Sequence, residues 1–435
     1  MRNAKNTPDV FLVSLVVLYA VRMRRSWYVL GLVGGLVAAV GGLAPAAGAT
    51  AVAGDVRGLW VQRTSLVSRE SVAKVVRTAR ENGFNTLLVQ VRGRGEAFYT
   101  SDLEPRASDL DSAPATFDPL ATVLDLAHAA NLKVHAWVNV NLVASGTTLP
   151  RSRTHIASRH PDWLMVPKAL AATMRNIDPR SPGYLGTLSR WTRTNSATVE
   201  GLFLSPLVPA AQDHSVAVIE ELLARYAVDG LHLDYIRFPN PEFDYAPAAL
   251  AEFRASLLPQ TTAADRDRLD RSAATDPTAW TSARPAAWAA FRRDRLTALV
   301  TRIATSARAV RPGVTISAAV APSPTDARDQ KFQDWRGWLA AKHLDVVCPM
   351  IYTTESENFG AAATTAIEAA GTAPVWAGIG AYRLPVARTA ENVRTARRLG
   401  AAGVVLFSYD NLVGDYFTTL RPVLLESAVQ GALGR

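Results

Sequence analysis

The stretch Val228-Asp229-Gly230-Leu231-His232-Leu233-Asp234-Tyr235-Ile236-Arg237-Phe238-Pro239 has the pattern of a short buried strand that ends in a carboxylate. Because side chains alternate between the two faces of a strand, Leu231 and Leu233 share one face, and His232 and Asp234 share the other. In a (β/α)8 barrel one face of each strand packs under helices, and the C-terminal ends form the mouth where reacting groups lie. This stretch therefore predicts such a barrel, with Asp234 at its mouth.

The chain on either side alternates short apolar strands with helical patterns, which is typical of βαβ units and a parallel sheet. Strands are predicted at residues 57–62, 85–91, 133–139, 230–235, 314–320, 344–352, 374–380 and 403–409. Helices are predicted at residues 71–82, 117–131, 215–226, 288–310, 335–342, 389–399 and 420–432. The predicted fold class is α/β, a (β/α)8 TIM-like barrel.

Two long connections, at residues 140–215 and 240–285, follow the third and fourth predicted strands. Structureless loops of this length are unusual in a compact domain. We therefore expect long insertions after these two strands, with a short strand at 199–204 in the first of them.

Residues 1–49 have the features of a targeting segment. Met23-Arg24-Arg25 starts a basic region, residues 27–40 are apolar, and Ala47-Gly48-Ala49 fits a small-x-small cleavage site. We expect a signal peptide or, if it is not cleaved, an N-terminal membrane segment. Residues 50–435 would then form a single exported domain, periplasmic or extracellular, that contacts a membrane only through an uncleaved N-terminal segment.

Composition narrows the classes of function. Of 435 residues, 49% are hydrophobic and 20% are charged, which is typical of a globular protein with a large core. The formal net charge is +9, but no Lys/Arg run with interleaved aromatic residues follows residue 49, so nucleic-acid binding is not expected. The single cysteine, Cys348, excludes an internal disulfide. Dinucleotide-binding, Walker and His-Glu-x-x-His motifs are absent, and no cofactor is expected.

The predicted strand ends are rich in Trp, Tyr, Asn, Gln, Arg and carboxylate side chains. Aromatic faces can pack on sugar rings, and amides and guanidinium groups bond hydroxyls. This combination favours a glycan as substrate. The residues predicted to bind it are Gln90, Arg92, Trp137, Asn139, His232, Arg237, Tyr352, Trp376, Tyr382 and Tyr409.

Structural alternatives exist for several of these residues. The indole rings of Trp60, Trp137 and Trp376 would equally well fill the barrel interior. His135 and His232 are more often hydrogen-bonded interior groups than catalysts.

Two further alternatives concern charged neighbours of the fourth strand. Arg237 is expected to pair with Asp234 or Asp244, which would hold Asp234 ionised if it is the partner. A zinc site built from His135, His232 and Asp234 is conceivable, but no metal is predicted.

Glycoside hydrolysis usually needs two carboxyl groups, one a proton donor and the other a nucleophile or base. Asp234 is predicted as the nucleophile or base, and Glu355, just past the sixth strand, as the acid. The fifth strand ends in Ala321-Pro322-Ser323-Pro324, without an acid. The alternatives to Glu355 are Glu96, Glu357, Asp326 and Asp410.

A series of motifs lies in order along the chain, at residues 57–61, 84–92, 97–99, 134–139, 229–239, 333–335, 345–352, 378–382 and 407–409. Across about residues 55–425 this series resembles the glycosyl hydrolase-like 10 family, most specifically at 229–239. The resemblance implies a TIM-like barrel, an exported protein and action on glycans. Some members of the family resemble hydrolases of peptidoglycan strands stripped of their peptides.

The chain departs from the family pattern in two places. The family often has Asn-Pro-Tyr-Arg after the Trp-Val of the third strand, whereas here Asn139 is followed by Val140-Asn141-Leu142. Leu204-Ser205-Pro206-Leu207 replaces a more usual Asp/Asn-Pro-Gly. Both departures concern the substrate cleft and leave Asp234 in place.

The sequence therefore predicts an exported glycoside hydrolase that cleaves O-glycosidic bonds of a polysaccharide, with bacterial cell-wall peptidoglycan glycan as the expected substrate. The alternative is a non-catalytic glycan-binding barrel of the cell envelope, which the missing acid of the fifth strand favours. New reducing ends in a glycan would separate the two, since a binding protein leaves the polymer uncut.

Overall fold

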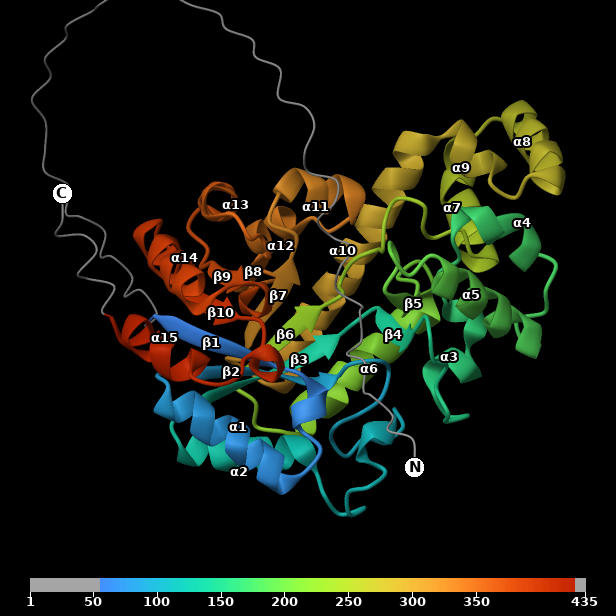
Figure 1. Cartoon of the computed structure of the whole chain (residues 1–435). Coiled ribbons are helices and arrows are strands. Elements are labelled where there is room, and N and C mark those ends of the chain that lie inside the picture. Colours follow the sequence, from blue (N-terminus) through green and yellow to red (C-terminus); the bar gives the residue numbers. More distant parts are fainter. Residues whose placement is uncertain (1–54, 427–435) are drawn as a thin grey trace, which may run out of the picture.

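A computed structural model describes residues 55–426. Eight parallel strands close into a barrel in the order β1-β10-β9-β8-β7-β6-β3-β2 (Figure 1), which confirms the predicted (β/α)8 fold. The barrel strands are β1 (Val56–Val61), β2 (Thr86–Arg92), β3 (Lys133–Asn139), β6 (Gly230–Asp234), β7 (Thr315–Val320), β8 (Val346–Ile351), β9 (Trp376–Ile379) and β10 (Gly403–Leu406). The targeting segment at 1–49 and the last residues of the predicted closing helix lie outside the described residues.

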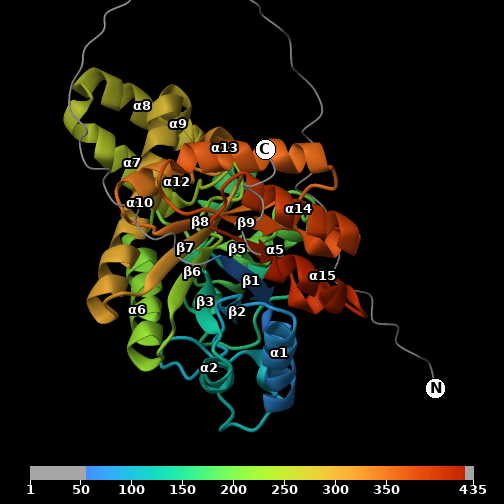
Figure 2. The same cartoon turned by 90° about the vertical axis from the view of Figure 1, so that its left-hand side faces the viewer.

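Helices surround this barrel (Figure 2). They are α1 (Arg69–Glu81), α2 (Pro119–Ala129), α6 (Pro209–Arg225), α10 (Pro285–Val310), α11 (Pro324–Gln330), α12 (Trp335–Ala340), α13 (Ser356–Ala370), α14 (Val386–Arg398) and α15 (Tyr416–Leu425). Within residues 55–426, no helix is both long enough and apolar enough to cross a membrane.

The two long connections contain secondary structure of their own. Between β3 and α6 lie β4 (Leu142–Ser145), α3 (Ile156–Arg159), α4 (Ala171–Met174), α5 (Pro182–Thr194) and β5 (Gly201–Phe203). Between β6 and α10 lie α7 (Pro247–Leu257), α8 (Ala263–Thr275) and α9 (Ala279–Ala283), which stand outside the ring of helices (Figures 1 and 2). The short strand predicted at 199–204 is β5, and it pairs antiparallel with β4 in a separate two-stranded sheet.

Local sequence explains where the first two helices begin. Ser68 caps α1, because its side chain accepts a hydrogen bond from the Ser71 N–H while the Ser71 side chain bonds back to Ser68. The Asp118 side chain accepts from the Ala121 N–H, and Pro119 supplies the fixed φ of the first residue of α2. The apolar residues of these helices are buried, among them Val72, Val75, Val76 and Ala79 of α1 and Leu120, Val123 and Leu124 of α2.

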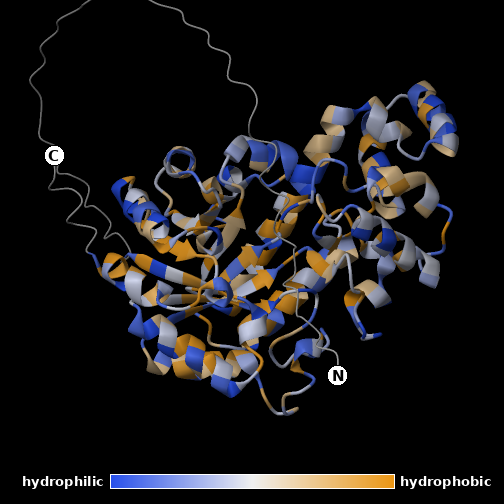
Figure 3. Ribbon diagram, in the orientation of Figure 1, coloured by the Kyte–Doolittle hydropathy of each residue, from blue (hydrophilic) through white to orange (hydrophobic). Residues whose placement is uncertain are grey.

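Two sets of apolar residues fill the two sides of the barrel wall. Leu231 and Leu233 belong to the large core between strands and helices, as the alternation of β6 predicts. The interior is filled by a smaller cluster that contains Trp60, Leu88, Trp137, Val346, Cys348, Trp376, Val405 and Phe407. Figure 3 shows the hydrophobic strands enclosed by helices whose outer faces are more hydrophilic.

Gly230 is needed where β6 enters the barrel. A Cβ atom at this position would lie only 2.2 Å from Nδ1 of His135 on the neighbouring strand β3. The absence of a side chain therefore lets the His135 ring occupy the lower part of the interior.

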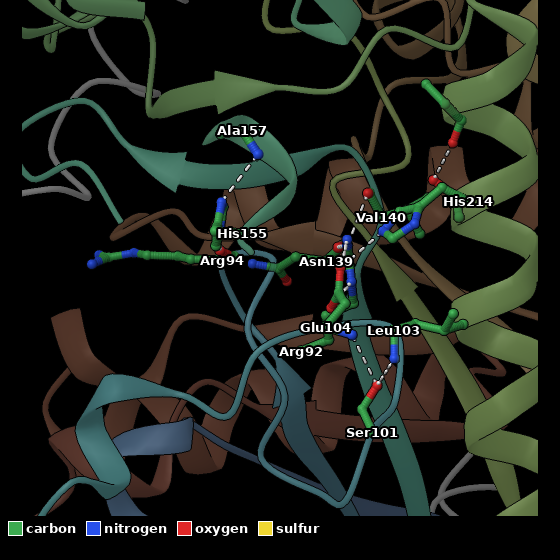
Figure 4. Close-up of polar contacts among 12 residues, drawn as sticks. Arg92, Arg94, Ser101, Leu103, Glu104, Asn139, Val140, His155, Ala157 and His214 are labelled. Carbon is green, nitrogen blue, oxygen red and sulfur yellow. Dashed lines mark hydrogen bonds and ion pairs between the residues drawn. The ribbon is translucent and has the colours of Figure 1, made fainter. Parts of the chain in front are cut away.

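A buried ion pair supports the C-terminal ends of β2 and β3 (Figure 4). Arg92 donates to both carboxylate oxygens of Glu104, at 2.7 and 2.5 Å, and its Nη1 also donates to the backbone oxygens of Asn139 and Val140. His214 of α6 lies 3.4 Å from Glu104. Although burial alone would raise the pKa of Glu104, Arg92 and His214 hold it at about 2. This carboxylate therefore remains ionised at neutral pH.

We predict that Glu104→Gln lowers the free energy of unfolding by about 3–5 kcal/mol at pH 7, because it leaves the Arg92 cation buried without its counter-charge. Urea denaturation measures the loss. Asp329→Asn is the matched control, since it breaks the exposed Arg328–Asp329 pair and should cost less than about 1 kcal/mol. Equal small losses in the two variants would show that the Arg92–Glu104 ion pair does not stabilise the fold.

Candidate active site

Asp234 is the last residue of β6, at the mouth of the barrel. Its Oδ2 accepts a hydrogen bond from the Trp137 indole N–H at 3.1 Å, and its Oδ1 accepts from the Tyr235 backbone N–H at 2.7 Å. Only 7% of the residue is exposed. The carboxylate is therefore fixed in orientation by two N–H donors, one on β3 and one in the turn directly after β6.

The backbone turns sharply directly after this carboxylate. Tyr235 has a φ of 50°, in the left-handed region that a residue with a bulky side chain rarely adopts. The turn brings its N–H back to the preceding side chain and directs the chain toward Arg237. Such conformations concentrate at functional sites, where the surrounding structure has to hold them.

Arg237 contributes a buried cation next to Asp234. Its Nη2 donates to Oε1 of Glu200 at 2.9 Å, and its guanidinium lies 4.2 Å from the centre of the Tyr235 ring. The prediction that Arg237 pairs with Asp234 or Asp244 is therefore wrong, since the ion-pair partner is Glu200, next to β5. Arg237 Nη1 and Glu200 Oε2 are both buried without a hydrogen-bond partner among the described residues.

Opposing effects act on the Asp234 carboxyl group. Burial raises its pKa above the usual value, and the negative charge of Glu200 adds to the rise. The Arg237 cation and the N–H groups of Tyr235 and Trp137 act in the opposite direction. The group is thus more basic than a solvated aspartate, yet has three neighbours that stabilise its anion.

Aromatic rings gather at the same end of the barrel. The Phe407 ring centre lies 6.2 Å from that of Trp137, 5.6 Å from Tyr352 and 5.8 Å from Tyr382. Burial raises the pKa of Tyr352, and the negative charge of Asp234 raises it further. The Tyr352 ring therefore lies within electrostatic reach of the carboxylate. Phe407 was not predicted as a site residue, although the alternation of the last strand turns it inward.

The rim above β2 carries a second polar group of residues. Gln90, only 5% exposed, accepts a hydrogen bond from Arg63 Nη1 at 3.1 Å. Arg63 Nε lies 3.4 Å from Asp109. Burial raises the pKa of the nearby Glu96, although Arg63 and a hydrogen bond from the Ser108 backbone oppose the rise.

The predicted acids differ in their surroundings. Asp410 accepts hydrogen bonds from the Gln62 N–H and from the hydroxyls of Ser65 and Thr64, so it anchors the loop after β1. Glu355 is exposed at the start of α13, where its Oε1 accepts from Thr354.

The remaining predicted acids lie elsewhere on the rim. Glu357 and Asp326 lie in the first turns of α13 and α11. Glu96 is half-buried in the loop that follows β2. Burial raises the pKa of Glu96 and of Asp410, but the Asp410 carboxylate holds the loop after β1 through its hydrogen bonds.

Some predicted sugar-binding residues lie below the mouth. His232 is fully buried, with Nε2 accepting from the Trp60 indole at 3.1 Å and Nδ1 2.9 Å from the Ser317 hydroxyl. Trp376 begins β9, at the opposite end of the strand, and packs on His135 with ring centres 5.4 Å apart. Both residues therefore fill the barrel interior and are not placed to contact a sugar at the mouth.

Arg92 and Tyr409 also differ from the prediction. A register shift between Gln90 and Arg92 breaks the alternation of β2, so the Arg92 side chain enters the buried ion pair with Glu104. Tyr409 lies beyond the end of β10 and packs on Phe417 of α15, with ring centres 5.9 Å apart. Neither side chain belongs to the mouth.

Asn139, the last residue of β3, stands level with Asp234 in the register of the two strands. Its Nδ2 donates to the Gly93 backbone oxygen at 2.8 Å, and its Oδ1 is buried without a hydrogen-bond partner within residues 55–426. Asn139 thus holds the loop that follows β2 beside the carboxylate.

The described residues include no group of three or more His, Cys, Asp and Glu side chains that could hold a metal ion. Both nitrogens of His232 are used in hydrogen bonds, and burial lowers its pKa to about 3. His232 is thus a neutral member of the interior.

Two hollows on the surface lie apart from Asp234. One, of about 770 Å³, is lined by residues of α11, α12 and the end of α13. The other, of about 790 Å³, is lined by residues from 158–162 and 178–185. No residue predicted to bind substrate lines either hollow.

The chain shares its (β/α)8 barrel with glycoside hydrolases of known structure. It superposes with a TM-score of 0.57 on the PgaB (BpsB) glycoside hydrolase domain of Bordetella bronchiseptica, at 15% identity over 86% of this chain and 100% of that domain. The α-L-fucosidase isoenzyme 2 of Paenibacillus thiaminolyticus gives 0.57 at 16% identity, over 85% and 49% of the two chains. Identities this low establish the fold alone.

Residues 55–391 match the family Glycosyl hydrolase-like 10, and the chain belongs to this family. It is 25% identical over 315 residues to glycosyl hydrolase YngK of Bacillus subtilis, covering 68% of this chain and 51% of that protein. It is 24% identical over 298 residues to glycosyl hydrolase DigH of Escherichia coli, covering 62% and 55%. The chain spans about half the length of these relatives.

We predict that Trp137→Phe raises the pKa of Asp234, because it removes an N–H group that stabilises the ionised form. NMR titration of isotope-labelled aspartate carboxyl groups measures the change, and Asp234→Asn identifies the resonance. Trp338→Phe is the control, since the Trp338 indole bonds Thr297 on the helical side of the barrel. A Trp137→Phe variant with an unchanged or lower pKa would show that this hydrogen bond does not act on the carboxylate.

Proposed function

We propose that the protein is a glycoside hydrolase that cleaves O-glycosidic bonds of a polysaccharide at the mouth of the barrel. The main support for this proposal is the position of the Asp234 carboxylate, which Trp137 and Tyr235 hold at the end of β6 beside aromatic rings. Family membership and the glycosidase fold support it. Asp234 acts as nucleophile at the anomeric carbon or as the base that activates a water molecule.

The proton donor is assigned to Glu96. A general acid at neutral pH needs a raised pKa and access to the leaving oxygen. Glu96 is half-buried at the rim, and burial raises its pKa. Glu355, the acid predicted from the sequence, is the alternative, since it is exposed beyond β8 and free of ion pairs within the described residues.

The aromatic rings provide the apolar part of the sugar site. Trp137, Tyr352 and Tyr382 surround Phe407 at the same end of the barrel as the carboxylate. Sugar rings have apolar faces that pack on aromatic side chains, and their hydroxyls need polar partners such as Gln90. Aromatic and amide groups together therefore suit a glycan chain laid across the mouth.

The proposed substrate is the glycan of bacterial peptidoglycan, and the proposed location is outside the cytoplasmic membrane. The basic and apolar pattern of residues 1–49 supports export. A glycan-binding barrel without activity is the rival function. Release of new reducing ends from de-peptidated peptidoglycan strands distinguishes the two, because a binding protein leaves the number of chain ends unchanged.

We predict that Asp234→Asn lowers the rate of reducing-end release at least about 100-fold, because it removes the reacting charge and keeps the shape of the side chain. Asp267→Asn, at an exposed position on α8, is the control and should retain the wild-type rate. Undiminished turnover in the Asp234→Asn variant would disprove the assignment of Asp234.

We predict that Glu96→Gln slows cleavage of the natural glycan about 100-fold or more, because the leaving oxygen is no longer protonated. An aryl glycoside with a good leaving group should lose much less, since its departure needs little protonation. Glu355→Gln is the matched comparison in the same two assays. If Glu355→Gln shows this selective loss while Glu96→Gln does not, the proton donor is Glu355.

A further inference from the structure

The loop that follows β2 carries an arginine on a rigid base. The Arg94 backbone oxygen lies 2.8 Å from Nε2 of His155, a fully buried ring whose Nδ1 accepts from the Ala157 N–H at 3.1 Å (Figure 4). Because burial lowers the pKa of His155, the ring is neutral, with Nε2–H as the donor to Arg94.

Gly95 holds the same loop against the His155 ring. Its φ is +66°, and a Cβ atom here would lie 2.8 Å from His155 Nε2, so both the conformation and the close approach require glycine. The backbone that carries Arg94 is therefore fixed from two sides.

In contrast, the Arg94 side chain has no partner. Within residues 55–426 its guanidinium forms no hydrogen bond and no ion pair, and Figure 4 shows it extending away from the Arg92–Glu104 cluster. The residue is partly exposed. A guanidinium can donate five hydrogen bonds in a planar fork that matches a carboxylate.

A second arginine packs on Gly93, the residue before Arg94. The Arg63 side chain passes so close to Gly93 that a Cβ atom there would lie only 2.8 Å from it. Its Nη1 donates a hydrogen bond to Gln90. Burial lowers the pKa of Arg63, and the positive charge of Arg94 lowers it further. The two cations therefore repel each other, and an anion bound between them would relieve the repulsion.

The Arg94 charge also reaches the candidate active site. It partly offsets the rise that burial causes in the pKa of Tyr235, the residue next to Asp234. It acts in the same way on Glu96, the proposed proton donor. Arg94 thus lies within electrostatic reach of Glu96 and of Tyr235, the residue that follows Asp234.

We infer that Arg94, supported by Arg63, is a specificity residue that binds a carboxylate carried by the sugar at the mouth. This inference rests on the proposed glycosidase function and adds a specificity residue to it. When Glu96 holds its proton, the four groups Arg63, Arg94, Glu96 and Asp109 leave an excess of positive charge. An acidic substituent such as the lactyl ether of a muramic acid residue would neutralise it.

The test uses one polymer in two forms, de-peptidated peptidoglycan strands and the same strands with their carboxyl groups reduced to alcohols. The wild-type protein should cleave the native strands with a kcat/KM about 10- to 100-fold above that for the reduced strands. Arg94→Gln should lose this factor on native strands and keep the wild-type rate on reduced strands. Arg94→Lys should recover part of the preference, because it restores the charge without the fork.

Arg271→Gln, at an exposed position on α8, is the control and should keep the full preference. If the wild type cleaves both polymers equally well, or if Arg94→Gln loses activity on both to the same extent, Arg94 does not recognise a carboxylate. The absence of cleavage of either polymer by the wild type would instead disprove the proposed function, so the two failures are distinguishable.

Discussion

The structure depends on a carboxylate that is kept in place at the edge of an apolar barrel interior. A buried anion is costly unless hydrogen bonds and a nearby cation compensate the lost hydration. Asp234 receives N–H donors from Trp137 on β3 and from Tyr235 in the turn after β6, and Arg237 supplies the cation. These contacts require β3 and β6 to stay in register, so the closed barrel and the geometry of the site depend on the same pairing.

The polar groups around this carboxylate form two separate layers. The Arg92–Glu104 pair at the ends of β2 and β3 and the Trp60–His232–Ser317 contacts in the barrel interior are buried and bonded to one another. At the rim, by contrast, Arg94 lacks a side-chain partner, and buried atoms of Arg237, Glu200 and Asn139 have none among the described residues. Among the described residues, buried polar atoms without a partner also occur elsewhere, for example Nδ1 of His135. Those at the rim lie beside Asp234, where a polar ligand at the mouth would supply their missing hydrogen bonds.

Sequence patterns predicted the barrel and the positions of Asp234 and Trp137, because strand parity and strand ends follow directly from apolar alternation. They failed where the chain leaves regular geometry. The register shift at Gln90 and Arg92 turned Arg92 away from the mouth, and the end of β10 after Leu406 moved Tyr409 to the outside. The Arg237–Glu200 pair joins residues 37 positions apart through the β4–β5 sheet, a contact that no local pattern specifies.

The most direct test of the central claim is a crystal structure of the Asp234→Asn variant with a bound oligosaccharide from de-peptidated peptidoglycan. We expect a sugar packed on the aromatic rings near Phe407, with its anomeric carbon about 3–3.5 Å from the side chain at position 234 or from a water molecule bonded to that side chain. An oligosaccharide bound only elsewhere, for example in the hollow between α11, α12 and α13, would contradict this expectation.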